Sequence, residues 1–345
     1  MNLLSKRLSA LAGAVVLASA LAGCGSESSA ADGELKEFRS VIFPGETYAL
    51  DYIAQEKGFF TDHGLKVSYL SPQSGSSAVQ MLAAGEVDGW STAPSIIYNA
   101  NSQGQPVQMA GLIPSYTAYE VVVDAKADWP AAAESPEDGL KALKGKTIGV
   151  SGLSAGTDLS LLAALNSVDL GEKDVKRLGV GTTLNGLGQL KAGVIDAYVE
   201  FTGSGARVIE NSGAGKRYIP LYGESASPEA DALSDLALAV NGDTAKAKPD
   251  LYDSWIAALE DAREWLQDPS NLDEASKIIA EASYKGEYEA EVKESLGALA
   301  ETLSSTESGF STSPERVQLQ IDVLKKIGGL KADAEVSPDA VLLKR

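Results

Sequence analysis

The sequence predicts an α/β protein built from two lobes, each with its own sheet. Short runs of β-branched and aliphatic residues alternate with stretches whose apolar residues recur at helical spacing, as in sheets with crossover helices. About 310 residues remain after the expected signal peptide and tether, which is more than one compact core usually serves. A helix-to-strand unit around Gly85 also recurs around Gly193. With 44% hydrophobic residues, the chain has enough apolar material for two cores.

An export signal precedes the body. Two cations, Lys6 and Arg7, stand before an apolar run at 8–22, which is the layout of a secretory signal and too short to be read first as a membrane span. The run ends in LAGC, which matches the bacterial lipoprotein box, where the thiol of Cys24 would receive a diacylglycerol. We expect a signal peptide at 1–23 and a lipidated Cys24 that anchors the protein at the extracytoplasmic face of the cell membrane. A chance cysteine after an ordinary signal peptide is the alternative.

The composition of the residues after Cys24 excludes some structural and functional classes. The residues after the cysteine are small and polar, so we expect residues 24–36 to form a flexible tether. Because Cys24 is the only cysteine, no disulfide can form inside the body. The net charge of −19 argues against nucleic acid as a partner, since phosphate contacts need clustered lysine and arginine. It does not determine the charge of a small ligand, because salt screens surface carboxylates over about 8 Å.

The first part of the body consists of two strand-to-helix units. In each, an apolar run is followed by a turn rich in proline, glycine or serine and then by a segment with helical periodicity. We expect strands at 38–43 and 67–70, turns at 44–47 and 71–77, and helices at 48–57 and 78–84.

An internal repeat relates this part to the middle of the chain. Residues 80–90 can be laid over 188–198 with Gly85 on Gly193, and each copy reads as a helix, a glycine cap, an aspartate and a strand that ends in an aromatic residue. The preceding segments also correspond, with a strand expected at 146–150, a loop at 151–158 and a helix at 159–166. We expect Asp88 and Asp196 to cap backbone. Coincidence between two ordinary helix-to-strand joins is the alternative.

Two loops of small and hydroxyl residues carry the candidate chemistry. The loops at 71–77 and 151–158 each stand where a strand ends and a helix begins, so free backbone N–H groups would point beyond the strands. Such loops bind oxyanions or polar oxygens, and ligands of open α/β sheets lie at this edge. Serine and threonine are also the commonest helix caps without any ligand, which is the plainer interpretation.

Ordered motifs resemble a known family. Residues 54–60 (AQEKGFF) and 64–67 (GLKV) resemble the opening of the nitrate, sulfonate, taurine and pyrimidine-precursor family of ABC solute-binding proteins. The loop Ser74 to Ser77 is similar to the first ligand loop of the family. Further similar segments are 84–88 (AGEVD), 143–150 (LKGKTIGV) and 192–197 (AGVIDA), and the resemblance covers about 38–265.

The resemblance implies a type II periplasmic-binding-protein fold, in which two α/β lobes are joined by two crossover strands. These strands are expected near 119–123 and 236–240. Lobe 1 would comprise 37–122 plus 237–345 and lobe 2 would comprise 123–236. Helices within 249–265 and 314–330 would pack back on lobe 1.

The resemblance also implies a function. The protein would be a monomer that captures a small organic solute between its lobes and delivers it to the permease and ATPase of an ABC importer. A sensor that binds the same ligand and feeds no transporter is the alternative. The ligand-binding residues implied by the resemblance are Glu46, Thr47, Tyr48, Ser74, Gly75, Ser76, Ser77, Ser91, Thr92, Ser154, Ala155, Gly156, Thr157, Asp158, Glu200 and Phe201.

The candidate loops contain no lysine or arginine and instead hold Glu46, Asp158 and Glu200. A carboxylate that pointed into the site would repel an inorganic dianion, which favours a neutral, zwitterionic or amine-bearing ligand. Carboxylates that face solvent or cap backbone are the alternative. The aromatic residues could stack on a ligand or pack within a lobe; they are Tyr48, Trp90, Tyr198 and Phe201.

Catalysis is not expected. The fold family includes a desulfinase with a cysteine nucleophile and a pyrimidine synthase that depends on histidine, whereas here Cys24 belongs to the lipoprotein box and the only histidine, His63, lies in a turn. No cluster has metal-ligand spacing, so neither a metal nor a cofactor is expected. The segment 213–217 (GAGKR) lacks the hydroxyl of a phosphate-binding loop and reads as an ordinary turn.

Overall fold

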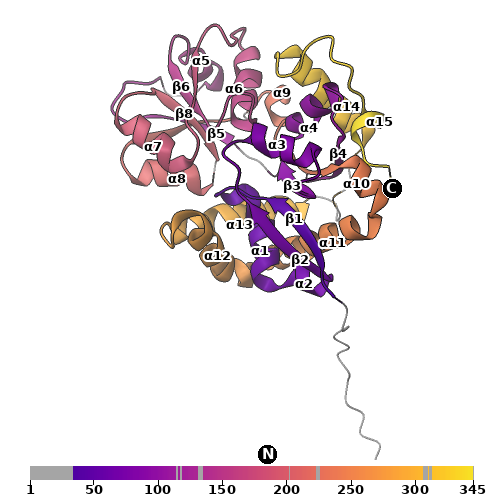
Figure 1. Cartoon of the computed structure of the whole chain (residues 1–345). Helices are drawn as coiled ribbons and strands as arrows, with labels where there is room; N and C mark the ends of the chain where they lie inside the picture. Colours follow the sequence, from indigo (N-terminus) through magenta and orange to yellow (C-terminus); the bar gives the residue numbers. More distant parts are fainter. Residues whose placement is uncertain are drawn as a thin grey trace, which may run out of the picture. The chain divides into compact units, whose positions relative to one another are not determined.

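Two five-stranded mixed sheets organise the chain in the computed structural model (Figure 1). The structure describes residues 34–113, 116, 119–130, 135–201, 203–222, 226–305, 310 and 313–344. The expected signal peptide, Cys24 and most of the tether lie outside these residues. Within the described part of the chain, no helix is long and apolar enough to cross a membrane.

The two sheets share one strand order. The first runs β2-β1-β3-β10-β4 and the second β7-β6-β8-β5-β9, and in each the fourth strand is antiparallel to its neighbours. The strands of the first sheet are β1 (Lys36–Val41), β2 (Leu65–Leu70), β3 (Gly89–Thr92), β4 (Val107–Ile113) and β10 (Leu236–Asn241). Those of the second are β5 (Tyr119–Asp124), β6 (Thr147–Val150), β7 (Lys176–Gly179), β8 (Ala197–Phe201) and β9 (Gly215–Pro220). This is the α/β fold of two similar halves that the sequence predicts.

The two expected crossover strands form where the sequence places them, as β5 and β10. The whole of β5 pairs within the second sheet, and the whole of β10 pairs within the first. The predicted lobe boundaries at 122/123 and 236/237 therefore fall inside these strands. Because Leu35–Arg345 forms one compact unit, the exact division into lobes remains a proposal.

Helices surround the sheets and begin at clear signals. Proline occupies the first turn of α4, α5, α11 and α14, where its missing N–H has no intrahelical partner to lose. The helices are α1 (Ala49–Lys57), α2 (Phe59–Asp62), α3 (Gly75–Ala83), α4 (Pro94–Ser102), α5 (Pro136–Lys141), α6 (Gly156–Asn166), α7 (Thr183–Lys191), α8 (Ser204–Asn211), α9 (Pro228–Asp231), α10 (Gly242–Ala247), α11 (Pro249–Gln267), α12 (Leu272–Tyr284), α13 (Glu289–Ser305), α14 (Pro314–Lys326) and α15 (Pro338–Val341), with short 3₁₀ helices η1 (Glu46–Tyr48) and η3 (Pro269–Asn271).

Corresponding hydrogen bonds in the two copies confirm the internal repeat. Asp88 Oδ2 accepts the backbone N–H of Arg39 at 2.8 Å, and Asp196 Oδ2 accepts that of Thr147 at the same distance. Each aspartate follows a glycine with positive φ, 72° at Gly85 and 67° at Gly193, a conformation in which a side chain would be strained. Both aspartates thus tie a helix-to-strand turn to the neighbouring strand, which confirms the expected capping role.

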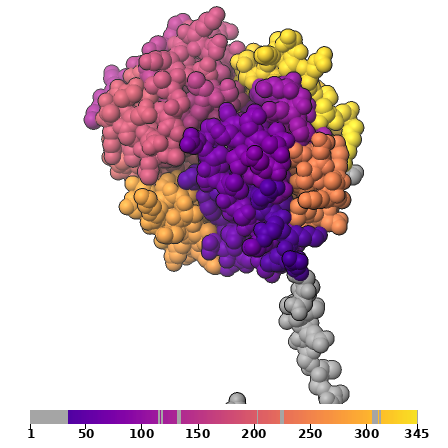
Figure 2. Space-filling view, in the orientation of Figure 1, coloured from indigo at the N-terminus to yellow at the C-terminus, as the bar shows by residue number. Residues whose placement is uncertain are grey.

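The C-terminal helices pack on the first sheet and also reach the second lobe. Helix α11 contacts α1 and α2, and α14 contacts α4 and α15, as the sequence predicts. Helices α12 and α13 pack together, and α13 also contacts α8 beside the second sheet. In Figure 2 the golden-orange surface of α12 and α13 lies against the pink surface of the second sheet's region. Helix α13 therefore lies between the halves, which the sequence did not indicate.

Candidate functional site

A cavity of about 290 Å³ lies where α13 meets the second lobe. Its walls come from η1 and α13 on one side and from β8, α8, β9 and α9 on the other. The lining residues are Glu46, Tyr116, Phe201, Gly203, Arg207, Arg217, Tyr222, Asp231, Ser234, Glu294, Ser295, Ala298, Leu299 and Thr302. Of the ligand-binding residues expected from the sequence, Glu46 and Phe201 belong to this lining.

Glu46 is a buried carboxyl at the start of η1. The residue is only 4% exposed, and its Oε1 has no hydrogen-bond partner among the described residues. Burial, with a smaller contribution from the nearby Glu200 carboxyl, raises the pKa of Glu46 to about 7, although hydrogen bonding, including that of Tyr284, lowers it. The hydroxyl of Tyr116 donates to the backbone carbonyl of Glu46 at 3.3 Å. The cavity therefore has an acid in its wall that is largely neutral below pH 7.

Glu200 on β8 is the second buried carboxyl. It is 7% exposed, its Oε1 accepts the backbone N–H of Phe201 at 2.8 Å, and its Oε2 has no partner among the described residues. Burial also raises the pKa of Glu200. A Cβ at Gly205 would lie 2.7 Å from Glu200 Cδ, so glycine at this position leaves room for the carboxyl. Glu46 on η1 and Glu200 on β8 lie close enough that the Glu200 carboxyl contributes to the raised pKa of Glu46.

The other residues expected near the first loop form a hydrogen-bonded group in the first lobe. Trp90 Nε1 donates to the Tyr48 hydroxyl at 3.0 Å, and a Cβ at Gly75 would lie 3.6 Å from the Trp90 ring. Ser91 Oγ donates to Asp51 Oδ2 at 2.9 Å. Thr92 is also buried, and Thr47 is half-buried in η1. Tyr48 and Ser91 thus have partners within the lobe.

The first serine loop caps its own helix. Ser74 Oγ accepts the backbone N–H of Ser77 at 3.2 Å and lies 3.1 Å from Ser77 Oγ. Ser74, Ser76 and Ser77 are exposed, so these hydroxyls remain accessible to solvent. This is the ordinary N-cap geometry of α3, with or without a ligand.

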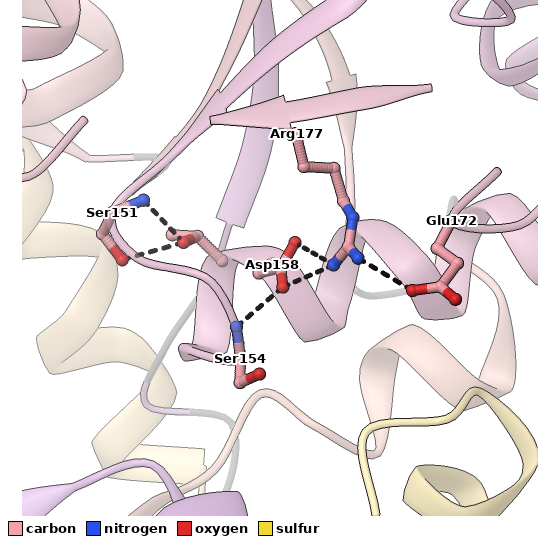
Figure 3. Close-up of polar contacts among 6 residues, drawn as sticks. Ser151, Ser154, Asp158, Glu172 and Arg177 are labelled. Carbon is pink, nitrogen blue, oxygen red and sulfur yellow. Dashed lines mark hydrogen bonds and ion pairs between the residues drawn. The ribbon is translucent and has the colours of Figure 1, made fainter. Parts of the chain in front are cut away.

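The second loop is held by an ion pair that the sequence did not indicate (Figure 3). Asp158 is fully buried and accepts Arg177 Nη1 at 2.6 and 2.7 Å and the backbone N–H of Ser154 at 2.7 Å. Ser154 has a φ of 64°, a left-handed conformation that this hydrogen bond stabilises. Thr157 Oγ1 accepts the backbone N–H of Ser151 at 3.0 Å. The charge of Asp158 is therefore compensated within the lobe.

The remaining residues of that loop lie at the start of α6. Ala155 is the residue before the helix, and a Cβ at Gly156 would lie 2.6 Å from the Tyr119 hydroxyl. Tyr119 in turn packs edge-to-face on Phe201, with ring centroids 5.1 Å apart. Within the described residues, no hydrogen bond or ion pair joins loop 74–77 to loop 154–158. The two loops are thus each tied to their own lobe.

Two arginines of the cavity were missed from the sequence. Arg207 Nη2 lies 2.5 Å from Glu294 Oε1 on α13, and Arg217 Nε donates to Glu120 Oε1 at 2.8 Å. The expectation that 213–217 is an ordinary turn is wrong in part. Gly213 turns the chain with a φ of 71°, but Gly215 already begins β9, and this strand carries Arg217 into the cavity wall. Alternation of polar and apolar side chains along the short segment after GAG was the signal that could have predicted this strand.

Asp51 is a further buried carboxyl that sequence reasoning did not single out. It is 1% exposed on α1, and burial raises its pKa to about 7 even though the hydroxyl of Ser91 donates to it. An acidic residue among the apolar positions of a helix was the signal that could have identified it. Within the described chain no group of three or more histidine, cysteine, aspartate or glutamate residues could hold a metal ion. His63 Nε2 instead lies 2.7 Å from Asp261 Oδ2.

Sequence comparisons place the chain among known proteins. The family described as NMT1/THI5 like matches residues 47–271, which is more than half of the chain. A protein of Haemophilus influenzae named for thiamine biosynthesis is 30% identical over 152 residues. That alignment covers 44% of this chain and 45% of the relative, so it spans less than half of the relative's length.

Solved structures share the fold at low identity. The alkanesulfonate-binding protein SsuA of Xanthomonas axonopodis pv. citri, bound to MOPS, has a TM-score of 0.67 at 16% identity over 90% of this chain and 97% of that one. The periplasmic nitrate-binding protein NrtA of Synechocystis PCC 6803 has a TM-score of 0.66 at 14% identity, with coverages of 88% and 84%. A mutant of DSZB in complex with biphenyl-2-sulfinic acid has a TM-score of 0.59 at 16% identity, with coverages of 89% and 96%. The predicted periplasmic-binding-protein fold is confirmed.

Proposed function

Because the chain belongs to the NMT1/THI5-like family, we propose that it is the extracytoplasmic solute-binding component of an ABC importer. In this proposal the protein is a monomer that binds a small organic solute between its two lobes and delivers it to the permease and its ATPase. The observation that carries the proposal is the cavity whose walls come from both halves of the chain. A ligand in such a cavity contacts both lobes at once, so it favours the closed arrangement that a permease can recognise.

The size of the cavity indicates a small ligand. A volume of about 290 Å³ is at the lower end of the roughly 300–1,000 Å³ of known ligand pockets. Its rings can cover apolar parts of a solute; they belong to Tyr116, Phe201 and Tyr222. The cavity therefore suits a compact organic molecule.

We propose roles in ligand binding for two groups of the sequence-derived residues. Glu46, Glu200 and Phe201 would contact the ligand, because Glu46 and Phe201 line the cavity and the Glu200 carboxyl is near enough to contribute to the raised pKa of Glu46. The loops 74–77 and 154–158 would present backbone N–H groups at the helix starts, with Asp158 holding the second loop in shape. No catalytic role is proposed, since the folded body has no cysteine and His63 is paired with Asp261.

Ligand capture can be tested on the purified protein. We expect native mass spectrometry under gentle conditions to show one small molecule per chain, and the same compound to stabilise ligand-free protein in a thermal-shift panel. A ligand at one hundred times its Kd stabilises by about 2.7 kcal/mol, which raises Tm by several degrees. The panel should include nitrate, alkanesulfonates, taurine, aminopyrimidines and organic amines. Absence of any bound mass and of any shift across the panel would count against solute binding.

The lipid anchor has a separate test. If Cys24 carries a diacylglycerol, mass spectrometry of the membrane-fraction protein should show residues 24–345 with the added mass of acyl chains, and Cys24→Ser should lack that added mass. The change should leave the Tm of the purified body unaltered, because the expected tether separates residue 24 from the folded part. A membrane-fraction protein without added acyl mass would contradict the anchor without bearing on ligand binding.

A further inference from the structure

We propose that the solute carries a positively charged nitrogen group, a protonated amine or amidine, which binds between the carboxylates of Glu46 and Glu200. This inference rests on the proposed function and specifies its ligand class. The sulfonate- and nitrate-binding neighbours are named for anionic groups, so the proposed ligand differs from theirs in the charge of the group that is recognised.

Most of the other buried carboxylates in the described chain pair with an arginine. Of the five other buried acids, four pair with an arginine at 2.6–3.1 Å, which satisfies their charge. The pairs are Asp88 with Arg39, Glu120 with Arg217, Asp158 with Arg177 and Asp235 with Arg316. The fifth, Asp51, accepts the hydroxyl of Ser91 and has no arginine partner among the described residues. Within the described residues, neither Glu46 nor Glu200 forms an ion pair, and each keeps one oxygen without a hydrogen-bond donor. A cation supplied from outside would complete both groups.

Glu46 and Glu200 belong to different halves of the fold. Glu46 comes from η1 beside the first sheet and lines the cavity, whereas Glu200 comes from β8 of the second sheet, one residue before the cavity-lining Phe201. A charged nitrogen between them would connect the two halves through two charge-assisted hydrogen bonds. The pair is thus placed to couple recognition of the ligand to closure.

The aromatic and charged residues in the rest of the cavity wall also favour a cationic ligand. Aromatic rings in the wall attract cations through their π faces, and the wall contains three of them. The two arginines that could attract an anion are each engaged by a carboxylate, Arg207 by Glu294 and Arg217 by Glu120. The lining contains three acidic residues, Glu46, Asp231 and Glu294, against these two arginines.

Binding of the cation should release a proton from Glu46 at low pH. Burial keeps Glu46 protonated up to about pH 7, so a cation must displace a proton below that pH. Affinity should therefore fall about tenfold from pH 8 to pH 6, with proton release that grows as the pH falls. The groups that face Glu46 or share its cavity are Glu200 on β8, Tyr284 on α12, Tyr116, Arg207 on α8, Arg217 on β9, Asp231 on α9 and Glu294 on α13.

Three probes of matched size and different charge test the proposal by titration calorimetry on the full folded body. They are benzamidine, which stays protonated throughout this pH range, benzyl alcohol, which is neutral, and benzoate, which is an anion. We expect benzamidine to bind at least about tenfold more tightly than either of the others. Glu46→Gln and Glu200→Gln should each weaken benzamidine by about 30-fold or more, as loss of one partner of a buried charge pair does. Glu86→Gln, at an exposed carboxyl, should leave the Kd unchanged.

The outcomes separate the two proposals. Tighter binding of benzoate than of benzamidine, or a benzamidine Kd unaffected by both glutamine variants, would overturn the cation site. Absence of binding by all three probes would also count against it, and circular dichroism of each variant would exclude misfolding as the cause. If native mass spectrometry then still detects an anionic solute, the solute-binding function stands and the cation site falls. If no solute is detected either, both fall.

Discussion

Asp158→Ala is expected to lower the free energy of unfolding by about 3–5 kcal/mol, because it leaves the Arg177 guanidinium partly buried without its main partner. The Asp158 side chain is 1% exposed and that of Arg177 is 17% exposed, so solvent replaces little of the lost interaction. The same change removes the acceptor for the backbone N–H of Ser154, whose left-handed conformation depends on it. Urea denaturation of the wild type and the variant measures the difference.

A matched control separates the buried pair from surface charge. Glu172 lies 3.0 Å from the same guanidinium, but its side chain is 63% exposed. Glu172→Ala should therefore cost no more than about 1 kcal/mol, as exposed ion pairs do. A double variant, Asp158→Ala with Arg177→Met, should recover part of the loss, because no charge is then left unpaired. Equal effects of the two single variants would mean that the pair does not stabilise the second loop.

Asp51→Asn is expected to remove a large pH dependence of stability. Burial raises the pKa of Asp51 from its ordinary value of 3.8 to about 7 in the folded protein. Between these pH values the folded state binds more protons than the unfolded state, so the contribution of Asp51 to stability is greatest below pH 4 and is lost as the pH rises to 7. Each pKa unit corresponds to about 1.4 kcal/mol, which makes the loss from Asp51 alone roughly 4 kcal/mol.

The asparagine variant should be more stable than the wild type at pH 8, by roughly 2–4 kcal/mol. An amide has no charge to desolvate, and its oxygen can still accept the hydroxyl of Ser91. Urea midpoints at pH 5, 6.5 and 8 measure the effect, with Asp333→Asn at an exposed position as the control. A variant that is less stable than the wild type at every pH would show that the buried carboxylate has a partner that offsets its desolvation.

Much of the architecture could be predicted because it depends on short stretches of sequence. The strand at 67–70, the helix stopped by Gly58 and the two crossover strands all appear within one or two residues of their expected positions. The repeat around Gly85 and Gly193 was also correct, since glycine with positive φ and a following aspartate form a local motif. These features depend on neighbours in the chain, so periodicity and turn chemistry suffice to locate them.

The candidate site was only partly predictable. Glu46 and Glu200 were singled out because of their place in a turn and after the repeated segment, but that both are buried and interact electrostatically depends on how the halves meet. Asp158 looked similar in the sequence, yet Arg177, 19 residues away, compensates it. Nothing in the local pattern distinguishes a carboxylate that has an arginine partner from one that lacks it.

The order of the elements, the repeated half and the capping aspartates therefore follow from the chain alone, through contacts made over a few residues. The cavity, its arginines and the contrast between paired and unpaired acids arise only in the folded molecule. Helix α13 forms one wall of the cavity, and its Glu294 engages Arg207 from the other half. The physical reason is that burial and charge compensation depend on groups distant in sequence, which only packing brings within a few ångströms of one another.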